Sequence, residues 1–377
     1  LESFVINTFG DADEVLILST HGGPVSVDSG DGDDVIAVRG VSGPTAIETG
    51  DGSDRVNIGS DAGILSNAVG SLNGIAASLV VDQEGGGSDV LDLDDSADLA
   101  ANVGIQLTAT QLSGLGTASG IGYAGVEDLR IHLGAGADEL VVLATHGGAT
   151  RIDGNGGADS IAVRTIAGAT TLHTHAGSDR VNVGSNAAPG SNGGGTVNGI
   201  GALLSVDLGP AETDVLDVDD SGDAAANLDG QLTATQLGGL GMTSGIAYAG
   251  VEDLRIHLGA GADELVVLET HGGATRIDGN GGGDTIHVHT ISGPTDLFTG
   301  TGADTVNVGS LTPAFGGVVD AIGDGAGDLL RIDGGADGDT DRLRVDHSGE
   351  VADPASRLVV TATTLAGLGM AEPLEYL

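Results

Sequence analysis

The chain has 377 residues, of which 69 are glycine, and its 55 acidic side chains outnumber 12 basic ones, all arginine, for a formal charge of −43. Such a field repels phosphate and anionic lipid, which argues against nucleic acid as a partner, and it attracts cations. Hydrophobic residues make up 40% of the sequence, too many for a disordered chain, and no apolar run is long enough to span a membrane. Cysteine is absent, so we expect neither disulfides nor thiol chemistry.

A long internal repeat dominates the sequence. Residues 125–160 recur almost unchanged at 250–285, and the start of the chain matches both with more divergence. We therefore divide the chain into three tandem repeats, 1–124, 125–249 and 250–377. Because its two ends fall at nearly the same phase of the repeat, we expect the chain to be an excerpt of a longer array.

Each repeat contains a shorter period. In the second repeat, Asp138, Asp159 and Asp179 close glycine-rich turns and lie 21 and 20 residues apart. Apolar residues alternate on both sides of these turns, which is the period of a strand with one buried face. A rung of two short strands cannot bury its apolar face alone, whereas stacked rungs share a core. The sequence therefore predicts an all-β fold, a parallel β-solenoid of rungs of about 20 residues.

The G-x-G-x-D turns are the candidate metal sites. Glycine permits the positive φ that turns backbone carbonyls inward, and the aspartate adds a carboxylate at the same place. Ca²⁺ binds about six to eight such oxygens, and stacked turns would place their carboxylates in one column along one edge of the solenoid. The predicted Ca²⁺ ligands are Asp13, Asp31, Asp33, Asp34, Asp51, Asp54, Asp89, Asp138, Asp159, Asp179, Asp263, Asp284, Asp304 and Asp341, with Gly30, Gly32, Gly134, Gly136, Gly259 and Gly261.

Two other interpretations of these aspartates stay open. Each side chain could simply cap its own turn by accepting hydrogen bonds from nearby N–H groups. The acidity could also be an adaptation to a salty habitat, where it keeps the surface hydrated.

The phrases at 30–34, 134–138 and 281–284 resemble the calcium-binding nonapeptide of haemolysin-type RTX proteins, in which Ca²⁺ lies between the turns of a parallel β-roll. The longer period here departs from that family, as does His175, which stands where Gly50 and Gly300 stand in the other repeats. The whole repeat is similar to the β-strand arrays of very large secreted bacterial surface proteins. These resemblances imply an extracellular or cell-surface location and a structural or adhesive role.

Ten histidines lie mostly at repeated positions. The pairs His173 with His175 and His287 with His289 have the H-x-H spacing that puts both side chains on one face of a strand, as a transition-metal site requires. Because the first repeat lacks both pairs, we interpret them as surface-facing polar residues. We predict a structural role for the histidines of the recurrent T-H-G-G corner, which are His21, His146 and His271.

These observations predict a structural protein without catalytic activity, a segment of a fibre, surface layer or adhesin stalk made rigid by Ca²⁺ at its stacked turns. The expected partners are other copies, in filaments or a lattice, with polysaccharide or a cell surface as further candidates. The alternative is an adhesive module that binds carbohydrate or a surface. A β-helix lyase or epimerase ranks third, since nowhere does the repetition give way to a concentration of reactive residues.

Overall fold

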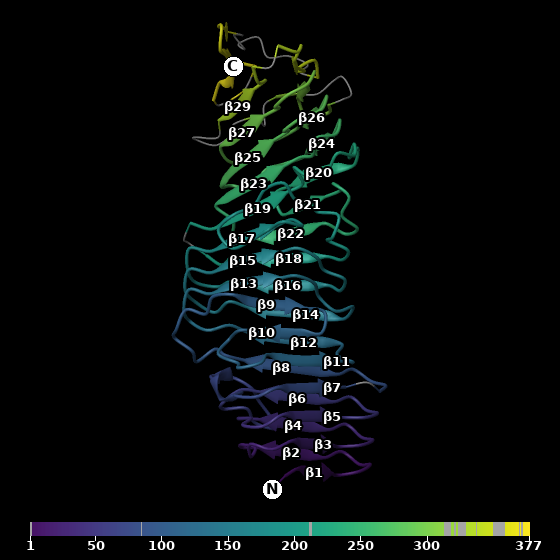
Figure 1. The fold of residues 1–377 in the computed structure, drawn as a ribbon. Helices are drawn as coiled ribbons and strands as arrows, with labels where there is room; N and C mark the ends of the chain where they lie inside the picture. Colours follow the sequence, from purple (N-terminus) through teal and green to yellow (C-terminus); the bar gives the residue numbers. More distant parts are fainter. Residues whose placement is uncertain are drawn as a thin grey trace. The chain divides into compact units, whose positions relative to one another are not determined.

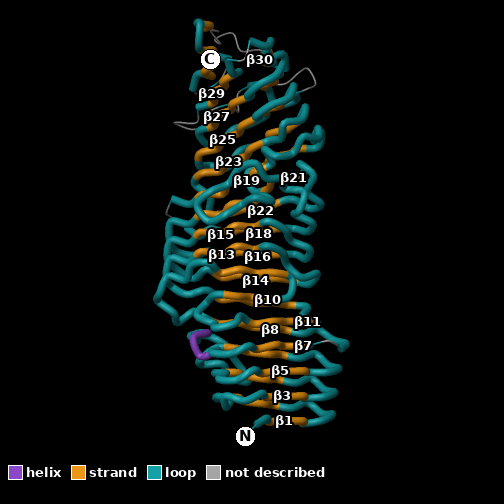
Figure 2. Tube along the Cα trace, in the orientation of Figure 1, coloured by secondary structure: helices purple, strands orange, loops and turns teal. Residues whose placement is uncertain are grey.

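The computed structural model describes residues 2–83, 85–210, 213–312, 318–319, 322, 329–336, 338–349, 359–368, 370 and 372–377. These residues are all-β, with strands stacked mostly in parallel, which confirms the predicted solenoid fold (Figures 1 and 2). Among them the only helix is the single 3₁₀ turn η1 (Leu72–Gly74). The chain divides into two compact units, unit 1 with residues 1–180 and 204–210, and unit 2 with residues 181–203 and 211–377. The division into three repeats is a property of the sequence and stays a prediction.

Unit 1 contains two sheets whose strands alternate along the chain. The first sheet has the order β1 (Phe4–Asn7), β3 (Val25–Asp28), β5 (Thr45–Glu48), β7 (Leu79–Asp82), β11 (Ile121–Ala124), β10 (Gln111–Ser113), β9 (Ile105–Thr108), β13 (Glu139–Val142) and β15 (Ser160–Val163). The second has the order β2 (Glu14–Ile17), β4 (Val35–Val38), β6 (Arg55–Ile58), β8 (Val90–Asp94), β12 (Asp128–His132), β14 (Ala149–Asp153), β16 (Thr170–His173) and β18 (Leu204–Asp207).

Unit 2 repeats this plan. One sheet has the order β19 (Val215–Asp219), β23 (Asp253–His257), β25 (Ala274–Asp278), β27 (Thr295–Phe298), β29 (Leu330–Asp333), β33 (Leu374–Tyr376), β32 (Thr364–Ala366) and β31 (Val359–Val360). The other has the order β22 (Ile246–Ala249), β21 (Gln236–Gly238), β20 (Gly230–Thr233), β24 (Glu264–Val267), β26 (Thr285–Val288), β28 (Thr305–Val308) and β30 (Arg342–Val345). Strand β17 (Arg180–Val183) spans the boundary between the two units along the chain.

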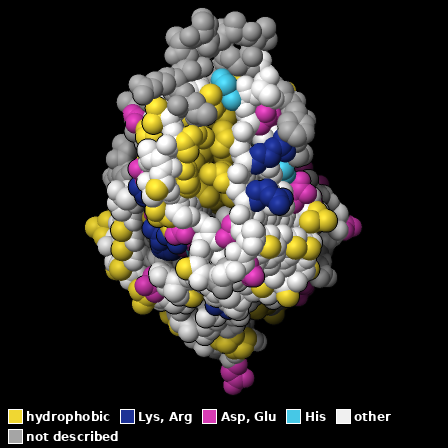
Figure 3. Space-filling view, turned by 90° about the horizontal axis from the view of Figure 1, so that it is seen from above, with side chains coloured by type: hydrophobic (Ala, Val, Ile, Leu, Met, Phe, Trp, Pro, Cys, Tyr) yellow, Lys and Arg dark blue, Asp and Glu magenta, His cyan; other side chains and the backbone are white. Residues whose placement is uncertain are grey.

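The core consists of aliphatic side chains stacked in register. In the second sheet of unit 1, Ile36 pairs with Val56, Val56 with Leu91, and Leu91 with Leu129. All four side chains are fully buried. Figure 3 shows hydrophobic side chains gathered at the centre of its view, with charged ones around them. Because each rung places similar β-branched or leucine residues over those of its neighbour, a continuous core forms with few aromatic residues.

The sequence did not predict an antiparallel insertion, which interrupts the parallel ladder in each repeat. In unit 1, β10 pairs antiparallel with both β9 and β11, and the Tyr123 hydroxyl donates to the Thr108 carbonyl at 2.6 Å. The Gly114-Leu115-Gly116 phrase lies in the turn between β10 and β11, where Leu115 has a φ of 49°.

This insertion changes which sheet a repeat begins in. Strand β1 lies in the first sheet of unit 1, whereas its repeat equivalent β12 lies in the second, between β8 and β14. Strands β1 to β9 alternate between the sheets, so β9 lies in the same sheet as β1. Strands β10 and β11 stay in that sheet, and the next crossing places β12 in the other sheet. The two equivalents are therefore separated by an odd number of half-coils, where a half-coil is one crossing from one sheet to the other. Equivalent turns of successive repeats therefore lie on opposite edges of unit 1.

The stacking of glycine on carbonyl oxygen at the turns generates a stability prediction. Gly157 has a φ of 115°, and a Cβ on it would lie 2.0 Å from the carbonyl oxygen of Gly136. We expect Gly157→Ala to lower the free energy of unfolding by about 1–3 kcal/mol. Gly147→Ala, at a corner where a Cβ would meet nothing within 4 Å, should change it little. Thermal unfolding followed by circular dichroism measures both, and equal stabilities would contradict the stacking argument.

Candidate functional site

The turn aspartates of the first repeat form a file of hydrogen bonds that runs from rung to rung. The N–H of Asp13 donates to Oδ1 of Asp34 at 2.8 Å. The N–H of Asp34 donates to Oδ1 of Asp54 at 2.9 Å, and that of Asp54 to Oδ1 of Asp89 at 2.7 Å. The N–H of Asp89 donates to Oε2 of Glu127 at 2.9 Å. Each carboxylate therefore satisfies a backbone donor of the preceding rung, and it joins the rungs as well as closing its own turn.

A second file in unit 1 follows the same rule. The N–H of Asn102 donates to Oδ1 of Asp138 at 2.7 Å. The N–H of Asp138 donates to Oδ1 of Asp159 at 2.9 Å, and that of Asp159 to Oδ1 of Asp179 at 2.8 Å. All three aspartates are at most 2% exposed.

Unit 2 contains an equivalent file. Its bonds are Asn227 N–H to Asp263 Oδ1 at 2.7 Å, Asp263 N–H to Asp284 Oδ1 at 2.9 Å, Asp284 N–H to Asp304 Oδ1 at 2.8 Å and Asp304 N–H to Asp341 Oδ1 at 3.1 Å. Asp263, Asp284 and Asp304 are buried, whereas Asp341 is exposed.

The expectation of one column along one edge is wrong. In unit 1 the aspartates of the first file precede β2, β4, β6 and β8 of the second sheet. Asp138 and Asp159 precede β13 and β15 of the first sheet. The two files therefore lie on opposite edges of unit 1, because the odd number of half-coils in a repeat exchanges the sheets. The aspartates are aligned within each file but not between files.

Several turn carboxylates have a second oxygen that nothing nearby compensates. Within the described ranges, the Oδ2 atoms of Asp34, Asp159 and Asp284 are buried without a hydrogen-bond partner. Burial raises the pKa of Asp159 to about 8 and that of Asp284 to about 7. An ionised carboxylate with one unpaired, buried oxygen is costly, so Asp159 and Asp284 favour a bound proton or a bound cation.

The turns that begin at Gly134 and Gly259 use both carboxylate oxygens. Oδ2 of Asp138 accepts the N–H of Gly134 at 3.1 Å, and Oδ2 of Asp263 accepts the N–H of Gly259 at 3.0 Å. Both oxygens of each aspartate are thus engaged by backbone N–H groups. Asp138 and Asp263 therefore cap their own turns, as in the first of the two alternative interpretations of the turn aspartates.

The fit of these turns to Ca²⁺ depends on backbone oxygens. Over the described ranges, no three His, Asp or Glu side chains are grouped closely enough to hold a metal ion. A cation at the turns of Asp34, Asp159 and Asp284 would therefore combine the buried Oδ2 atom with glycine-turn carbonyls and water, an oxygen-only donor set that suits a hard cation. The orphaned buried oxygens are the feature that fits such an ion.

Three predicted ligands lie on the surface of the first file's turns. Asp31, Asp33 and Asp51 are exposed. Oδ1 of Asp33 accepts the N–H of Ser53 in the next rung at 2.9 Å. These residues are not part of the buried file, although Asp33 makes its own contact between rungs.

The predicted turn glycines let neighbouring rungs approach closely. A Cβ on Gly32, Gly136 or Gly261 would lie 2.4, 2.3 or 2.2 Å from a carbonyl oxygen of the adjacent rung. Gly30 has a φ of 88°, and a Cβ on it would lie 2.9 Å from the backbone of Phe9. At Gly134 and Gly259 the corresponding distance, to a carbonyl oxygen, is 2.6 Å. The glycines are therefore required by stacking, with or without a metal.

The neighbouring aspartates Asp94 and Asp95, at the end of β8, anchor the loop that contains Gly70 and Leu72. Oδ2 of Asp94 accepts the N–H of Gly70 at 2.5 Å, and Oδ1 of Asp95 accepts the N–H of Leu72 at 2.7 Å. Both aspartates are buried, and burial raises the pKa of Asp95 to about 7. Their repeat equivalents Asp219 and Asp220 make the same two contacts.

The outer face of the second sheet of unit 1 carries a row of alternating carboxylates and imidazoles. Its members, aligned across five neighbouring strands, are Asp94, His132, Asp153, His173 and Asp207, here called the acid–imidazole row. Nδ1 of His132 lies 3.2 Å from Oδ2 of Asp153. That hydrogen bond, together with nearby carboxylates, raises the pKa of His132. The repeat offset together with the pairing of rungs is the signal in the sequence from which this row could have been predicted.

The predicted structural role of the T-H-G-G corner fits the contacts found there. In unit 1, His146 packs edge-on against Tyr123, with ring centroids 6.1 Å apart, and burial lowers its pKa. His271 packs in the same way against Tyr248. The interpretation of the H-x-H pairs as surface-facing is wrong for His287, which is only 2% exposed.

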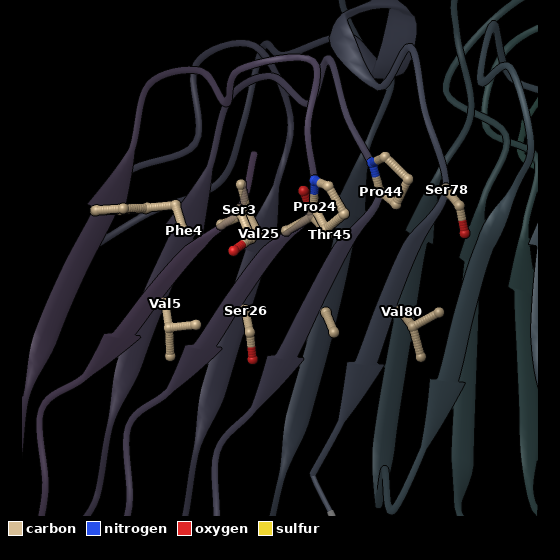
Figure 4. A pocket seen from close by; sticks show the side chains of 11 residues that line it. Ser3, Phe4, Val5, Pro24, Val25, Ser26, Pro44, Thr45, Ser78 and Val80 are labelled. Carbon is tan, nitrogen blue, oxygen red and sulfur yellow. The ribbon is translucent and has the colours of Figure 1, made fainter. Parts of the chain in front are cut away.

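A hollow of about 390 Å³ lies over the outer face of β1, β3, β5 and β7 (Figure 4). Val5, Ser26 and Val80 project into it from the strands, and Pro24 and Pro44 line its rim (Figure 4). No lining side chain is ionisable, so this hollow is not a cation site.

The chain matches no family model and no curated protein sequence. The resemblance to calcium-binding repeats therefore rests on the quoted residues and stays a prediction. In the described part of the chain, no helix is both long and apolar enough to cross a bilayer.

The raised pKa values generate a pH prediction. Asp159 has a pKa of about 8 in the folded protein, above its ordinary value near 4. The stability that folding gains from the proton on Asp159 is therefore complete below about pH 4 and is lost as the pH rises through 8. In chelator, the metal-free protein should therefore lose stability between pH 5 and pH 8. Asp159→Asn keeps an acceptor for the N–H of Asp138 and removes the charge, and we expect it to be about 1–3 kcal/mol more stable than the parent protein at pH 8.

Asp51→Asn, at an exposed position of the first file's turns, is the matched control and should leave the pH dependence unchanged. The measurement is denaturant unfolding at a series of pH values. A parent protein whose stability is independent of pH in this range, or an Asp159→Asn variant no more stable than the parent at pH 8, would contradict the assignment.

Proposed function

We propose that this chain is an extracellular or cell-surface structural protein, part of a fibre, surface layer or adhesin stalk, whose stacked turns bind Ca²⁺. The observation that carries the proposal is the set of buried turn carboxylates in files, of which Asp34, Asp159 and Asp284 each keep one buried oxygen without a partner in the described residues. A contact that recurs from rung to rung is typical of a structural scaffold, whereas an enzyme has one catalytic centre.

The charge balance supports a cation. The chain carries a formal charge of −43, and the buried files concentrate part of it at neighbouring rungs. Adjacent strands lie about 4.8 Å apart, so ionised neighbours in one file repel each other strongly in a medium of low dielectric constant. The metal-free protein avoids this cost by keeping a proton on a carboxylate such as Asp159, and a bound Ca²⁺ would replace that proton. Binding to the folded state alone would then add to stability.

The extracellular location is part of the same proposal. Its support is the calcium requirement together with the resemblance to secreted repeat proteins. A chain that needs Ca²⁺ to fold fully would stay loosely folded in a low-calcium cytosol and become rigid after export.

Self-association into filaments or a lattice also belongs to the proposal. Its support is the resemblance of the repeat to the β-strand arrays of large secreted surface proteins. Sedimentation velocity in millimolar Ca²⁺ should show concentration-dependent oligomers, and a monomer at every concentration would remove this part of the proposal.

The calcium dependence is tested by thermal unfolding in 5 mM Ca²⁺ and in chelator at about pH 7.5, followed by circular dichroism. We expect the melting temperature to rise by roughly 10 °C or more with Ca²⁺, since binding to several sites adds a few kcal/mol. Mg²⁺ at the same concentration and matched ionic strength of NaCl are the controls for charge screening. Equal melting temperatures in Ca²⁺ and in chelator would refute the calcium proposal.

A further inference from the structure

Two histidines at the end of β16 face an open hollow in unit 1. The hollow has a volume of about 480 Å³ and is lined by His173, His175, Ala176, Asp207, Gly209 and Pro210. The rings of His173 and His175 are stacked, with centroids 5.9 Å apart and planes inclined by 28°. Their side chains are 26% and 49% exposed, so both are accessible from solution.

Each imidazole has one nitrogen beside a carboxylate. Nδ1 of His173 lies 3.4 Å from Oδ2 of Asp207, and Nε2 of His175 lies 3.4 Å from Oδ1 of Asp153. A carboxylate beside one ring nitrogen is the usual environment of a metal-binding histidine, because it fixes the tautomer and makes the other nitrogen more basic. The remaining nitrogens, Nε2 of His173 and Nδ1 of His175, make no hydrogen bond to any described residue.

The backbone at His175 is a second, independent observation. Its φ is 69°, in the left-handed region that disfavours residues with a Cβ. The equivalent positions in the other repeats are Gly50 and Gly300, whose φ values are 81° and 92°. The second repeat thus places a histidine where the backbone geometry favours glycine. Strain of this kind at a polar, accessible side chain is characteristic of functional positions.

Five other histidines are committed to structural contacts. His132 and His257 each lie between two carboxylates. Nε2 of His289 lies 2.8 Å from the carbonyl oxygen of Thr312, and His287 is buried beside Glu264. His146 is packed against Tyr123. The second H-x-H pair therefore shares the spacing of the first pair but not its accessible nitrogens.

We propose that His173 and His175 chelate a divalent transition-metal ion, of the class of Cu²⁺, Ni²⁺ or Zn²⁺, through Nε2 and Nδ1 respectively. No three side chains of the described residues are preformed as a metal site, so the two imidazoles supply the protein ligands and water completes the coordination. Imidazole favours these ions over Ca²⁺, which takes oxygen ligands. The site differs from the proposed calcium turns in its nitrogen ligands, although His175 belongs to the turn that Asp179 closes, and it exists only in the second repeat.

The test titrates the whole chain with Cu²⁺ at pH 7.5 in 5 mM Ca²⁺, with binding followed by calorimetry and electron paramagnetic resonance. We expect one tight site whose spectrum shows coupling to two imidazole nitrogens. His175→Gly installs the residue found in the other repeats and should keep the fold. It should weaken binding at this site at least tenfold and remove the two-nitrogen signature.

His289→Ala, which removes the imidazole that contacts the carbonyl oxygen of Thr312, is the matched control and should leave the Cu²⁺ site unchanged. His173→Phe introduces the residue that the third repeat has at this position, Phe298, and serves as a second loss-of-ligand variant. Absence of a two-nitrogen site in the parent protein, or its survival in His175→Gly and His173→Phe, would overturn the proposal. Because Ca²⁺ is present throughout, either result leaves the calcium proposal to its own experiment.

Discussion

The structure depends on a hydrogen bond between rungs, in which the backbone N–H of one turn aspartate donates to the carboxylate of the next. This bond recurs along every file, as from Asp34 to Asp54 and from Asp138 to Asp159. It fixes the turns at the same spacing as the strands, so the sheets and their edges stay in register. At Asp54 and Asp159 the carboxylate is also buried, which removes water from an ionisable group and makes its protonation state part of the fold.

Glycine and aspartate act together in this arrangement. The glycine allows the carbonyl of one turn to pack against the backbone of the next, as between Gly136 and Gly157, and this close approach excludes water from the carboxylate beside it. The turn is thus compact enough to bury Asp159 but leaves its Oδ2 atom without a partner among the described residues. In the metal-free protein a proton compensates that oxygen up to about pH 8, and we propose that Ca²⁺ takes the place of this proton when it binds.

Part of this architecture was predictable from the sequence. The alternation around Leu129 and Ile131 predicted strands, and the spacing of Asp138 and Asp159 predicted rungs, because burial on one face and a shared core impose those periods. The antiparallel insertion was not predicted, since its strands β10 and β11 are short and resemble turns. The exchange of edges was therefore not predicted either, because the number of half-coils in a repeat determines which edge a turn occupies. Which carboxylate oxygen stays unpaired depends on three-dimensional contacts such as that of Gly134 with Asp138, which spacing does not reveal.

The central claim is that buried turn carboxylates such as Asp159 and Asp284 hold protons when metal-free and that Ca²⁺ replaces these protons. Isothermal titration calorimetry of Ca²⁺ binding at pH 7, repeated in two buffers of different ionisation enthalpy, tests it most directly. The account predicts that the observed heat depends on the buffer, with protons released on binding, and that Asp159→Asn releases fewer. Calcium binding with no proton release, or no binding at millimolar Ca²⁺, would contradict it.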